Sequence, residues 1–319
     1  MRTLVTCMGE CLIDFLPVPN GNAHDFRMHP AGAPLNIAVG IARLDQPAAF
    51  VCKVADDYFG RFLRDYIVAE GVDSRFLAIA PGRSTLAFVT MEDGHPSFNF
   101  YGEGAADALL TPADISAALF EETAIFHTGS FSLMRGTTPQ AALVAVERLK
   151  GKALLSLDPN IRPTIIEDEA SYRALLQHLF ALVDMLKLSD ADLAWLLPGK
   201  TNEEALVELS AYGPALVIVT CGAEGALALR SQGAPMRVPG FAVDVVDTVG
   251  AGDAFCAGLL ARCAQLGIVR REALQELADE DVEALLLRAS AAAALNCTRA
   301  GANPPRPAEI EAFLQARQR

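Results

Sequence analysis

Three small residues stand directly before a carboxylate in the segment D-V-V-D-T-V-G-A-G-D-A-F-C-A, residues 244–257. Gly250, Ala251 and Gly252 place no side-chain bulk between the backbone and a neighbouring molecule. Apolar residues follow at helical spacing, so these residues and Asp253 would form the first turn of a helix. The free N–H groups of a helix N-terminus bind anions. The segment therefore predicts a place where an anion and a base meet.

The same residues also have a purely structural interpretation. An acidic residue such as Asp253 is favourable in the first turn of any helix, and glycines before a helix often form only a tight turn. The chain contains no G-x-x-x-x-G-K-[ST] phosphate loop. The glycines also lie too late in the chain for a dinucleotide-binding fingerprint, which follows the first strand. Taken alone, the segment leaves both interpretations open.

The composition favours a packed globular protein and argues against several classes of partner. Of the 319 residues, 52% are hydrophobic and 20% are charged, and the formal net charge is −13. Because no block of Lys and Arg occurs, we expect neither nucleic acid nor a membrane surface as a partner. The seven cysteines form no C-x-x-C pair and lie mostly in apolar stretches, which is typical of reduced thiols. With no signal-peptide pattern at the N-terminus, we expect a cytoplasmic protein.

Short apolar runs alternate with helical patterns after residue 110. Strand-like runs lie at 124–127, 153–157, 185–188 and 215–220. Helical patterns lie at 138–149, at 169–182 and in a stretch that ends at Trp195. The strand-like runs are almost continuously apolar, which is typical of parallel strands covered by helices on both faces. This part of the chain predicts an α/β fold.

The first hundred residues differ from this pattern. Core strands are predicted at 4–8 and 49–54, with a helix at 34–44 between them. Alternating strands are predicted at 11–18, 86–91 and 97–101, the last two joined by a turn at 92–94. We therefore expect one domain over residues 1–319 with a small β-sheet lid, formed by insertions at about 11–33 and 84–106.

Polar residues or glycines follow four predicted strands, the fourth being a run at 242–246. In an open parallel sheet, ligands bind beyond the carboxyl ends of the strands. The residues at these ends are Asp158, Asn160 and Arg162; Ser189, Asp190 and Asp192; Thr220, Cys221, Gly222 and Gly225; and Asp247, Thr248 and the glycine segment. We expect them to line one polar crevice.

Two segments together resemble the signatures of a known family. D-T-V-G-A-G-D-A-F at 247–255 is similar to the C-terminal signature of the ribokinase-like (pfkB) sugar kinases, and A-G-A-P-L-N-I-A-V-G-I-A-R-L at 31–44 to their N-terminal signature. The intermediate segments G-E-C-L-I-D-F, V-A-D-D-Y-F-G-R-F-L, S-L-D-P-N-I-R-P, K-L-S-D-A-D and V-T-C-G-A-E-G resemble the fructokinase branch, in the same order. The resemblance covers essentially the whole chain and implies a ribokinase-like α/β fold with a mostly parallel central sheet.

The resemblance implies a role for each matching residue. Asp253 would be the catalytic base, and Gly250, Ala251 and Gly252 would help to stabilise the transferring phosphoryl group. The residues implied in binding the sugar, or the phosphates beside it, are Asp14, Gly32, Asn36, Asn160 and Arg162. Those implied in binding the nucleotide are Lys187, Ser189, Thr220, Gly222, Gly225, Gly301 and Asn303.

The resemblance also implies ATP as phosphoryl donor together with Mg²⁺, which ATP carries mainly on its phosphates and water. Asp192 would reach Mg²⁺ through water, although relatives have a longer Glu there. Asp247 matches a site for a monovalent cation such as K⁺, and the sequence leaves open whether that site is used. Relatives often pair into homodimers through the lid, which leaves a homodimer open here too.

Several residues also have a simpler explanation. Asp14 would be a solvated loop acid, Asn36 a helix N-cap, and Arg162 the partner of Asp168. Two further departures from the family are Ala31, where a glycine is usual, and Gly102, where many relatives carry an arginine. The missing arginine argues against a sugar acid as substrate.

The main functional hypothesis is an ATP-dependent fructokinase that makes fructose 6-phosphate. The alternatives are a kinase for ribose, a nucleoside or 2-keto-3-deoxygluconate, and a non-catalytic sugar-binding regulator of the same fold. The intact glycine segment and Asp253 count against the regulator, because a binding protein needs no base.

Overall fold

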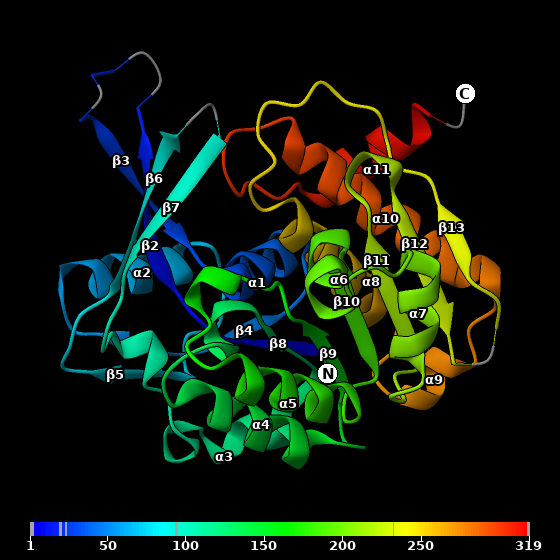
Figure 1. Ribbon diagram of the computed structural model, residues 1–319, viewed down its shortest axis with the longest axis horizontal. Coiled ribbons are helices and arrows are strands. Elements are labelled where there is room, and N and C mark those ends of the chain that lie inside the picture. The colour runs from blue at the N-terminus through cyan, green and yellow to red at the C-terminus, as the bar shows by residue number, and fades with distance from the viewer. Residues whose placement is uncertain (1–2, 19–20, 23, 93–94, 232, 318–319) are drawn as a thin grey trace.

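The computed structural model describes residues 3–18, 21–22, 24–92, 95–231 and 233–317. A central sheet of nine strands forms the middle layer (Figure 1). Its strands, in spatial order, are β13 (Met236–Val238), β12 (Ala226–Arg230), β11 (Leu216–Thr220), β10 (Met185–Ser189), β9 (Leu154–Asp158), β8 (Thr123–Gly129), β1 (Leu4–Met8), β4 (Ala48–Ala55) and β5 (Leu77–Ala80). The strands from β11 to β5 are parallel, and β12 and β13 are antiparallel additions at one edge.

Helices cover both faces of this sheet. One face packs against α1 (Ala33–Arg43), α2 (Tyr58–Ala69), α8 (Ala251–Leu266), α9 (Arg271–Gln275), α10 (Asp279–Cys297) and α11 (Pro307–Gln315). The other packs against α3 (Ala117–Glu122), α4 (Thr138–Leu149), α5 (Glu169–Phe180), α6 (Asp190–Leu196) and α7 (Asn202–Ser210). In β1, Val5 and Cys7 contribute to the first core and Met8 to the second. Because both faces are covered, the parallel strands read as continuous apolar runs.

A second sheet projects from the body at the upper left of Figure 1. Its four strands, in spatial order, are β3 (Phe26–Ala31), β2 (Leu12–Pro17), β6 (Thr85–Glu92) and β7 (His95–Tyr101). The outer pairs are antiparallel, and the central pair, β2 with β6, is parallel. The sheet therefore joins two segments that are separated in sequence by α1, β4, α2 and β5. We call this four-stranded sheet the small sheet.

The predicted α/β fold is confirmed, and most predicted elements lie within two residues of the observed ones. The predicted turn at 92–94 falls partly outside the described residues. The predicted strand at 242–246 is wrong, because this segment is irregular. At its end, the Val246 amide donates to the carbonyl of Cys297, the last residue of α10, at 2.8 Å. Val245 and Val246 are exposed instead of buried. Within the described residues, no helix has both the length and the apolar character needed to cross a membrane.

Helices α1 and α8 approach closely through small residues. A Cβ atom built on Gly40 of α1 would lie 2.6 Å from Cβ of Ala257 in α8, well inside van der Waals contact. On the other side of α8, a Cβ on Gly258 would lie 3.1 Å from Cβ of Ala292 in α10. These contacts leave no space for larger side chains between the helices.

Enlarging Gly40 should therefore separate α1 from α8. We expect Gly40→Ala to lower the free energy of unfolding and Gly40→Val to lower it more, by about 1–3 kcal/mol for overpacking of this kind. Urea denaturation would measure both variants against the parent protein. Equal stability of Gly40→Val and the parent would show that the interface yields without cost.

Candidate active site

The glycine segment begins α8, as the sequence predicts. Gly250 is the N-cap residue and has the left-handed φ of 75°. A Cβ atom there would lie 2.6 Å from Cβ of Ala302, so both the conformation and the contact require glycine. The Ala251 amide donates to the Thr248 carbonyl at 3.2 Å. We therefore expect Gly252 and Asp253 to supply the main N–H donors for an anion at this helix end.

Asp253 forms a direct hydrogen bond with a residue that is distant in sequence. The side-chain amide of Asn36, on α1, donates to Oδ2 of Asp253 at 2.8 Å. Burial raises the pKa of Asp253 to about 6, although the hydrogen bond from Asn36 lowers it. The carboxyl group is thus largely ionised at neutral pH, yet its pKa is close enough to neutrality to suit a general base. Asn36 is not a helix N-cap, because that position belongs to Gly32.

A buried ion pair lies beside the start of α8. Nζ of Lys187 is 2.8 Å from Oδ2 of Asp158, and both side chains are at most 5% exposed. Burial by itself lowers the pKa of Lys187, but the Asp158 carboxylate outweighs this effect and keeps the pKa above its ordinary value. Nζ also lies 3.2 Å from the point where a Cβ on Gly252 would stand. The ammonium group therefore lies beside the helix N-terminus, where it can donate hydrogen bonds, while the Asp158 carboxylate compensates its charge.

Asp158 is a residue whose role the sequence did not reveal. It is the last residue of β9, where the sequence predicts a strand end, but its pairing with Lys187 depends on neighbouring strands and on residues 29 positions apart. The other carboxylate oxygen, Oδ1, is buried without a hydrogen-bond partner. Polar atoms of this kind are rare inside folded proteins and commonly face a bound ion, water or ligand.

Asn160 and Arg162 follow β9 on the same side of the sheet. Asn160 has a positive φ of 41°, and its side-chain amide donates to Oγ of Ser130 at 3.3 Å. Arg162 donates to the carbonyls of Asn160 and Ile161, and its charge lowers the pKa of Asp253. Arg162 does not pair with Asp168, which caps α5 by accepting from the amides that follow it. The guanidinium of Arg162 therefore lies near the Asp253 end of the site.

Asp14 and Gly32 belong to the side formed by the small sheet. Asp14 is in β2, opposite His29 of β3 and Ala87 of β6, so it is a strand residue and not a solvated loop acid. Burial raises its pKa to about 7. Gly32 has a φ of 120°, and a Cβ there would lie 2.5 Å from the Glu10 carbonyl oxygen. The alanine at position 31 is accommodated as the last residue of β3.

Several residues implied in nucleotide binding lie at or after the ends of β10 and β11. Thr220, Gly222 and Gly225 form the turn between β11 and β12, where a Cβ on Gly225 would lie 2.1 Å from the Val238 carbonyl oxygen. Gly225 is therefore required for packing within the turn. Ser189 is the N-cap of α6 and bonds Asp192.

Gly301 and Asn303 lie in a loop that is tied to the start of α8. The Gly301 amide donates to Oδ2 of Asp247 at 2.8 Å, and Oδ1 of Asp247 accepts from the Val249 amide at 3.0 Å. Oδ1 of Asn303 accepts from Arg43 of α1 at 2.7 Å. Asp247 thus joins the two loops that would surround a nucleotide.

The contacts of Asp192 are those of a residue at a helix start, and its predicted role at Mg²⁺ through water stays a prediction. Its carboxylate accepts from the Ile161 amide at 2.6 Å and from the amide and hydroxyl of Ser189 at 2.8 and 2.7 Å. These bonds form a capping box at the start of α6, which is a structural role. Among the described residues, no group of three or more His, Cys, Asp or Glu side chains could hold a metal ion.

The sequence did not indicate what surrounds Gly102, and the prediction against a sugar acid stays a prediction. A cation does stand there, because Nη1 of Arg135 donates to the Gly102 carbonyl oxygen and would lie 2.6 Å from a Cβ at this position. The guanidinium is paired with the carboxylate of Asp107 at 3.1 Å. Its charge is therefore compensated, and an arginine introduced at position 102 would have no space.

Comparison with known proteins gives one consistent result. A family model described as pfkB family carbohydrate kinase matches residues 2–309. Fructokinase-1 of Oryza sativa subsp. japonica is 38% identical over 319 residues, which cover 97% of this chain and 96% of that protein. A crystal structure of fructokinase from Xylella fastidiosa with bound ATP superposes with a TM-score of 0.92 at 30% identity, covering 100% of both chains. Fructokinase from Vibrio cholerae O395 in its fructose, ADP and calcium ion bound form gives a TM-score of 0.85 at 29% identity, covering 98% of this chain and 99% of that chain.

The hydrogen bond from Asn36 should control the acidity of Asp253. Because the bond stabilises the carboxylate form, Asn36→Ala should raise the pKa of Asp253 above its value of about 6 in the parent protein. Carbon-13 NMR of protein labelled at the Asp carboxyl groups would measure the titration, and Asp253→Asn would identify the resonance. A pKa that is unchanged in Asn36→Ala would contradict this coupling.

Proposed function

Since this chain belongs to the pfkB family of carbohydrate kinases, we propose that it is an ATP-dependent fructokinase that makes fructose 6-phosphate. The observation that carries the proposal is the pairing of Asp253 with Asn36 at the N-terminus of α8, beside Lys187. This arrangement combines a base of suitable pKa with the N–H groups of a helix N-terminus and of an ammonium group, which can bind a phosphoryl group. The fructokinases of rice, Xylella and Vibrio that the chain resembles support fructose as the substrate.

Asp253 acts as the general base of the transfer. Its carboxylate takes the proton of the sugar 6-hydroxyl as that oxygen forms a bond to the γ-phosphorus of ATP. The bond from the γ-phosphorus to the bridging oxygen breaks, and its electron pair leaves with ADP. Charge on the transferring group is stabilised by the amides of Gly252 and Asp253 and by the ammonium of Lys187, which are fixed before the reaction begins.

The sugar binds between the body and the small sheet, which serves as a lid. Asp14 of β2 accepts from sugar hydroxyls, Asn36 orients the sugar beside the base, and the backbone at Gly32 lets it approach closely. Asn160 and Arg162 face the phosphoryl side. A neutral ketohexose is favoured over a sugar acid, because a carboxylate would meet Asp14 and Asp253 while Arg135 is already neutralised by Asp107.

The metal ions of the reaction are held mainly by the nucleotide. Mg²⁺ would be held mainly by phosphate oxygens of the nucleotide and by waters, since among the described residues no group of three or more His, Cys, Asp or Glu side chains could hold a metal ion. When bound, Mg²⁺ neutralises charge on the phosphates. A monovalent cation such as K⁺ would be held by Asp247 and the carbonyls of the loops that it joins, and would stabilise the Gly301 loop.

The lid also offers a surface for a second copy of the chain. Phe15 and Phe88 stack at 4.7 Å on one face of the small sheet, and Tyr101 packs edge-on against Phe88 at 5.7 Å. Tyr101 is 65% exposed and Tyr58 of α2 is 63% exposed. We propose that these aromatic side chains form a homodimer interface, since Tyr is enriched in such interfaces.

Replacing Tyr101 with Glu should weaken such a dimer by placing a charge in the interface. Sedimentation velocity at micromolar concentration would show parent protein as a dimer and the variant shifted towards monomer. Glu103→Lys, an exposed change two residues away, is the control for an effect of charge alone. A monomeric parent protein would refute the homodimer.

The proposed reaction is tested by ADP release across a panel of fructose, ribose, a nucleoside and 2-keto-3-deoxygluconate. We expect kcat/KM for fructose to exceed that for the sugar acid by about 10²-fold or more. Activity should require Mg²⁺, and a response to K⁺ would identify the monovalent site. Preference for another sugar would overturn the substrate while leaving a kinase, and binding without turnover would favour a regulator.

Replacement of the base separates binding from chemistry. Asp253→Asn should bind ATP and fructose, as measured by calorimetry, but lower kcat by about 10²–10⁴-fold, the usual contribution of a positioned base. The change removes one negative charge and keeps the size of the side chain. A kcat within a few-fold of the parent value would exclude Asp253 as the base.

A further inference from the structure

We propose that Arg135 is a positioning residue that fixes the small sheet over the sugar site and so determines the affinity for the sugar. This inference rests on the proposed function for the identity of the sugar, but its geometry does not. Arg135 follows β8 and belongs to the body of the molecule, whereas the groups that it binds belong to the base of the small sheet. We call residues 130–135 the anchor segment.

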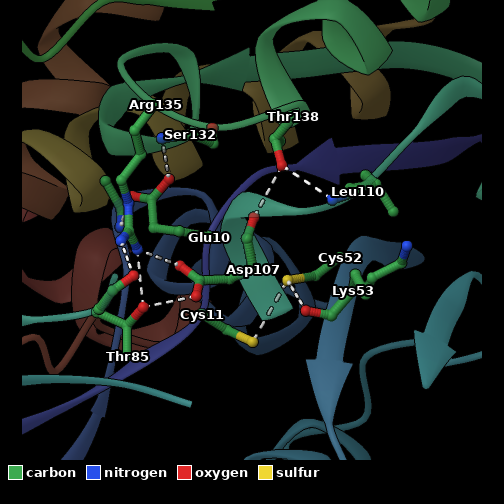
Figure 2. Close-up of polar contacts among 12 residues, drawn as sticks. Glu10, Cys11, Cys52, Lys53, Thr85, Asp107, Leu110, Ser132, Arg135 and Thr138 are labelled. Atoms are coloured by element: carbon green, nitrogen blue, oxygen red, sulfur yellow. Dashed lines mark hydrogen bonds and ion pairs between the residues drawn. The ribbon is translucent and has the colours of Figure 1, made fainter. Parts of the chain in front are cut away.

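The guanidinium group of Arg135 binds the start of β6 and the end of β7, which are neighbouring strands of the small sheet. Nη1 donates to the carbonyl oxygen of Gly102, the first residue after β7. Nη2 donates to Oγ1 of Thr85, the first residue of β6, at 2.7 Å. Figure 2 shows Arg135, Thr85 and Asp107 converging on this point. One side chain therefore holds both ends of the β6–β7 hairpin.

Asp107 completes this arrangement. Oδ2 of Asp107 pairs with Nη2 of Arg135 at 3.1 Å, and Oδ1 accepts from the hydroxyl of Thr85 at 2.6 Å. The side chains of Arg135 and Asp107 are 10% and 3% exposed. Because the pair is removed from water, its geometry matters more than that of a surface ion pair, and loss of one partner leaves a buried charge.

The other two strands of the small sheet, β2 and β3, are held by the same anchor segment through Glu10. Oε2 of Glu10 accepts from the Ser132 amide at 3.0 Å, and Oε1 accepts from the Ala33 amide at 3.2 Å. Glu10 lies just before β2, and Ala33 follows β3 across Gly32. All four strand bases of the small sheet are therefore tied, directly or through Glu10, to residues 130–135.

The anchor segment also contacts one side chain of the small sheet and one residue of the proposed site. The ring of Phe131 lies under the Arg135 guanidinium at 4.1 Å and packs against Phe100 of β7, with ring centroids 5.2 Å apart. Oγ of Ser130 accepts from the side chain of Asn160 at 3.3 Å. The position of the small sheet is thus linked mechanically to a residue on the phosphoryl side. Asp14 belongs to the same sheet, so a displacement of the sheet would move a side chain that is proposed to bind the sugar.

The hydrogen bonds of Arg135 depend on the planar guanidinium group, which has two terminal nitrogens. It reaches the Gly102 carbonyl with one nitrogen, and Thr85 and Asp107 with the other, which the single ammonium group of lysine cannot do in the same geometry. Arg135→Lys therefore keeps the charge that Asp107 needs but loses the connection between the two strand ends. This separates a positioning role from simple charge compensation.

The test compares Arg135→Lys and Arg135→Ala with the parent protein. Both variants should raise the KM for fructose by about 10-fold or more while leaving the KM for ATP within two-fold, because the nucleotide groups lie on the body. Thermal unfolding should show Arg135→Lys close to the parent and Arg135→Ala less stable. If Arg135→Ala does not fold, Arg135→Lys carries the test.

Arg173→Ala is the matched control. Arg173 lies over the ring of Trp195 at 3.9 Å, pairs with Glu169 and donates to the carbonyls of Trp195 and Leu196, but it contacts only the body. Its loss should affect stability without changing the KM for fructose. An equal rise in KM in Arg173→Ala would show a general effect of destabilisation and would overturn the proposal.

Hydrogen exchange of the protein without substrates provides a readout that does not depend on the reaction. Backbone amides at 85–92 and 99–101 should exchange faster in Arg135→Lys than in the parent, and at the parental rate in Arg173→Ala. Exchange and fructose KM that both stay at parental values in Arg135→Lys would refute the positioning role. Faster exchange in a protein that turns over no fructose would instead support the anchor and reject the proposed substrate.

Discussion

The hydrogen bond between Asn36 and Asp253 is the interaction on which the rest of the site depends. It joins α1, which begins two residues after β3 of the small sheet, to α8, whose N-terminus is the proposed place for an anion. The two helices can approach this closely because Gly40 faces Ala257. Burial raises the pKa of Asp253 to about 6, and the bond acts against this rise by favouring the carboxylate form. The bond therefore links the acidity of Asp253 to the alignment of the two helices, which the small residues between them allow.

A protein with a net charge of −13 must create positive potential locally in order to bind phosphate. In the proposed site, groups that are fixed by their neighbours would do so. Asp158 holds Lys187 near the start of α8, and the helix N-terminus adds its own partial charge. On the nucleotide side, Asp247 ties the start of α8 to the Gly301 loop, and Arg43 ties α1 to Asn303. Fixed charges of this kind need little rearrangement during a reaction, which is the main advantage of an enzyme site over water.

The small sheet is held to the body by buried polar contacts as well as by hydrophobic packing. Glu10 and Arg135 both act at the strand bases, and each is nearly excluded from water. Buried polar contacts are directional, so they define one position of a sheet more strictly than apolar contacts alone. Arg135 also shows that a cation absent from one position of the sequence can be supplied from another, since its guanidinium stands beside Gly102.

The residues expected in the site followed from the resemblance to the pfkB family. The sequence by itself determined the α/β class, most strands of the central sheet and the start of α8. These features depend on short-range signals: apolar runs, helical spacing, and glycines before an acidic residue. Tertiary structure alone decided which residues pair. Asn36 meets Asp253 across 217 residues, Arg135 reaches Gly102 across 33, and Asp192 turned out to cap a helix. It also placed β3, which contains Pro30, at an edge of the small sheet. Finally, it decided that the segment 242–246 is irregular and bonds through Val246 to the end of α10, because a hydrogen-bond partner far away in sequence leaves no local pattern.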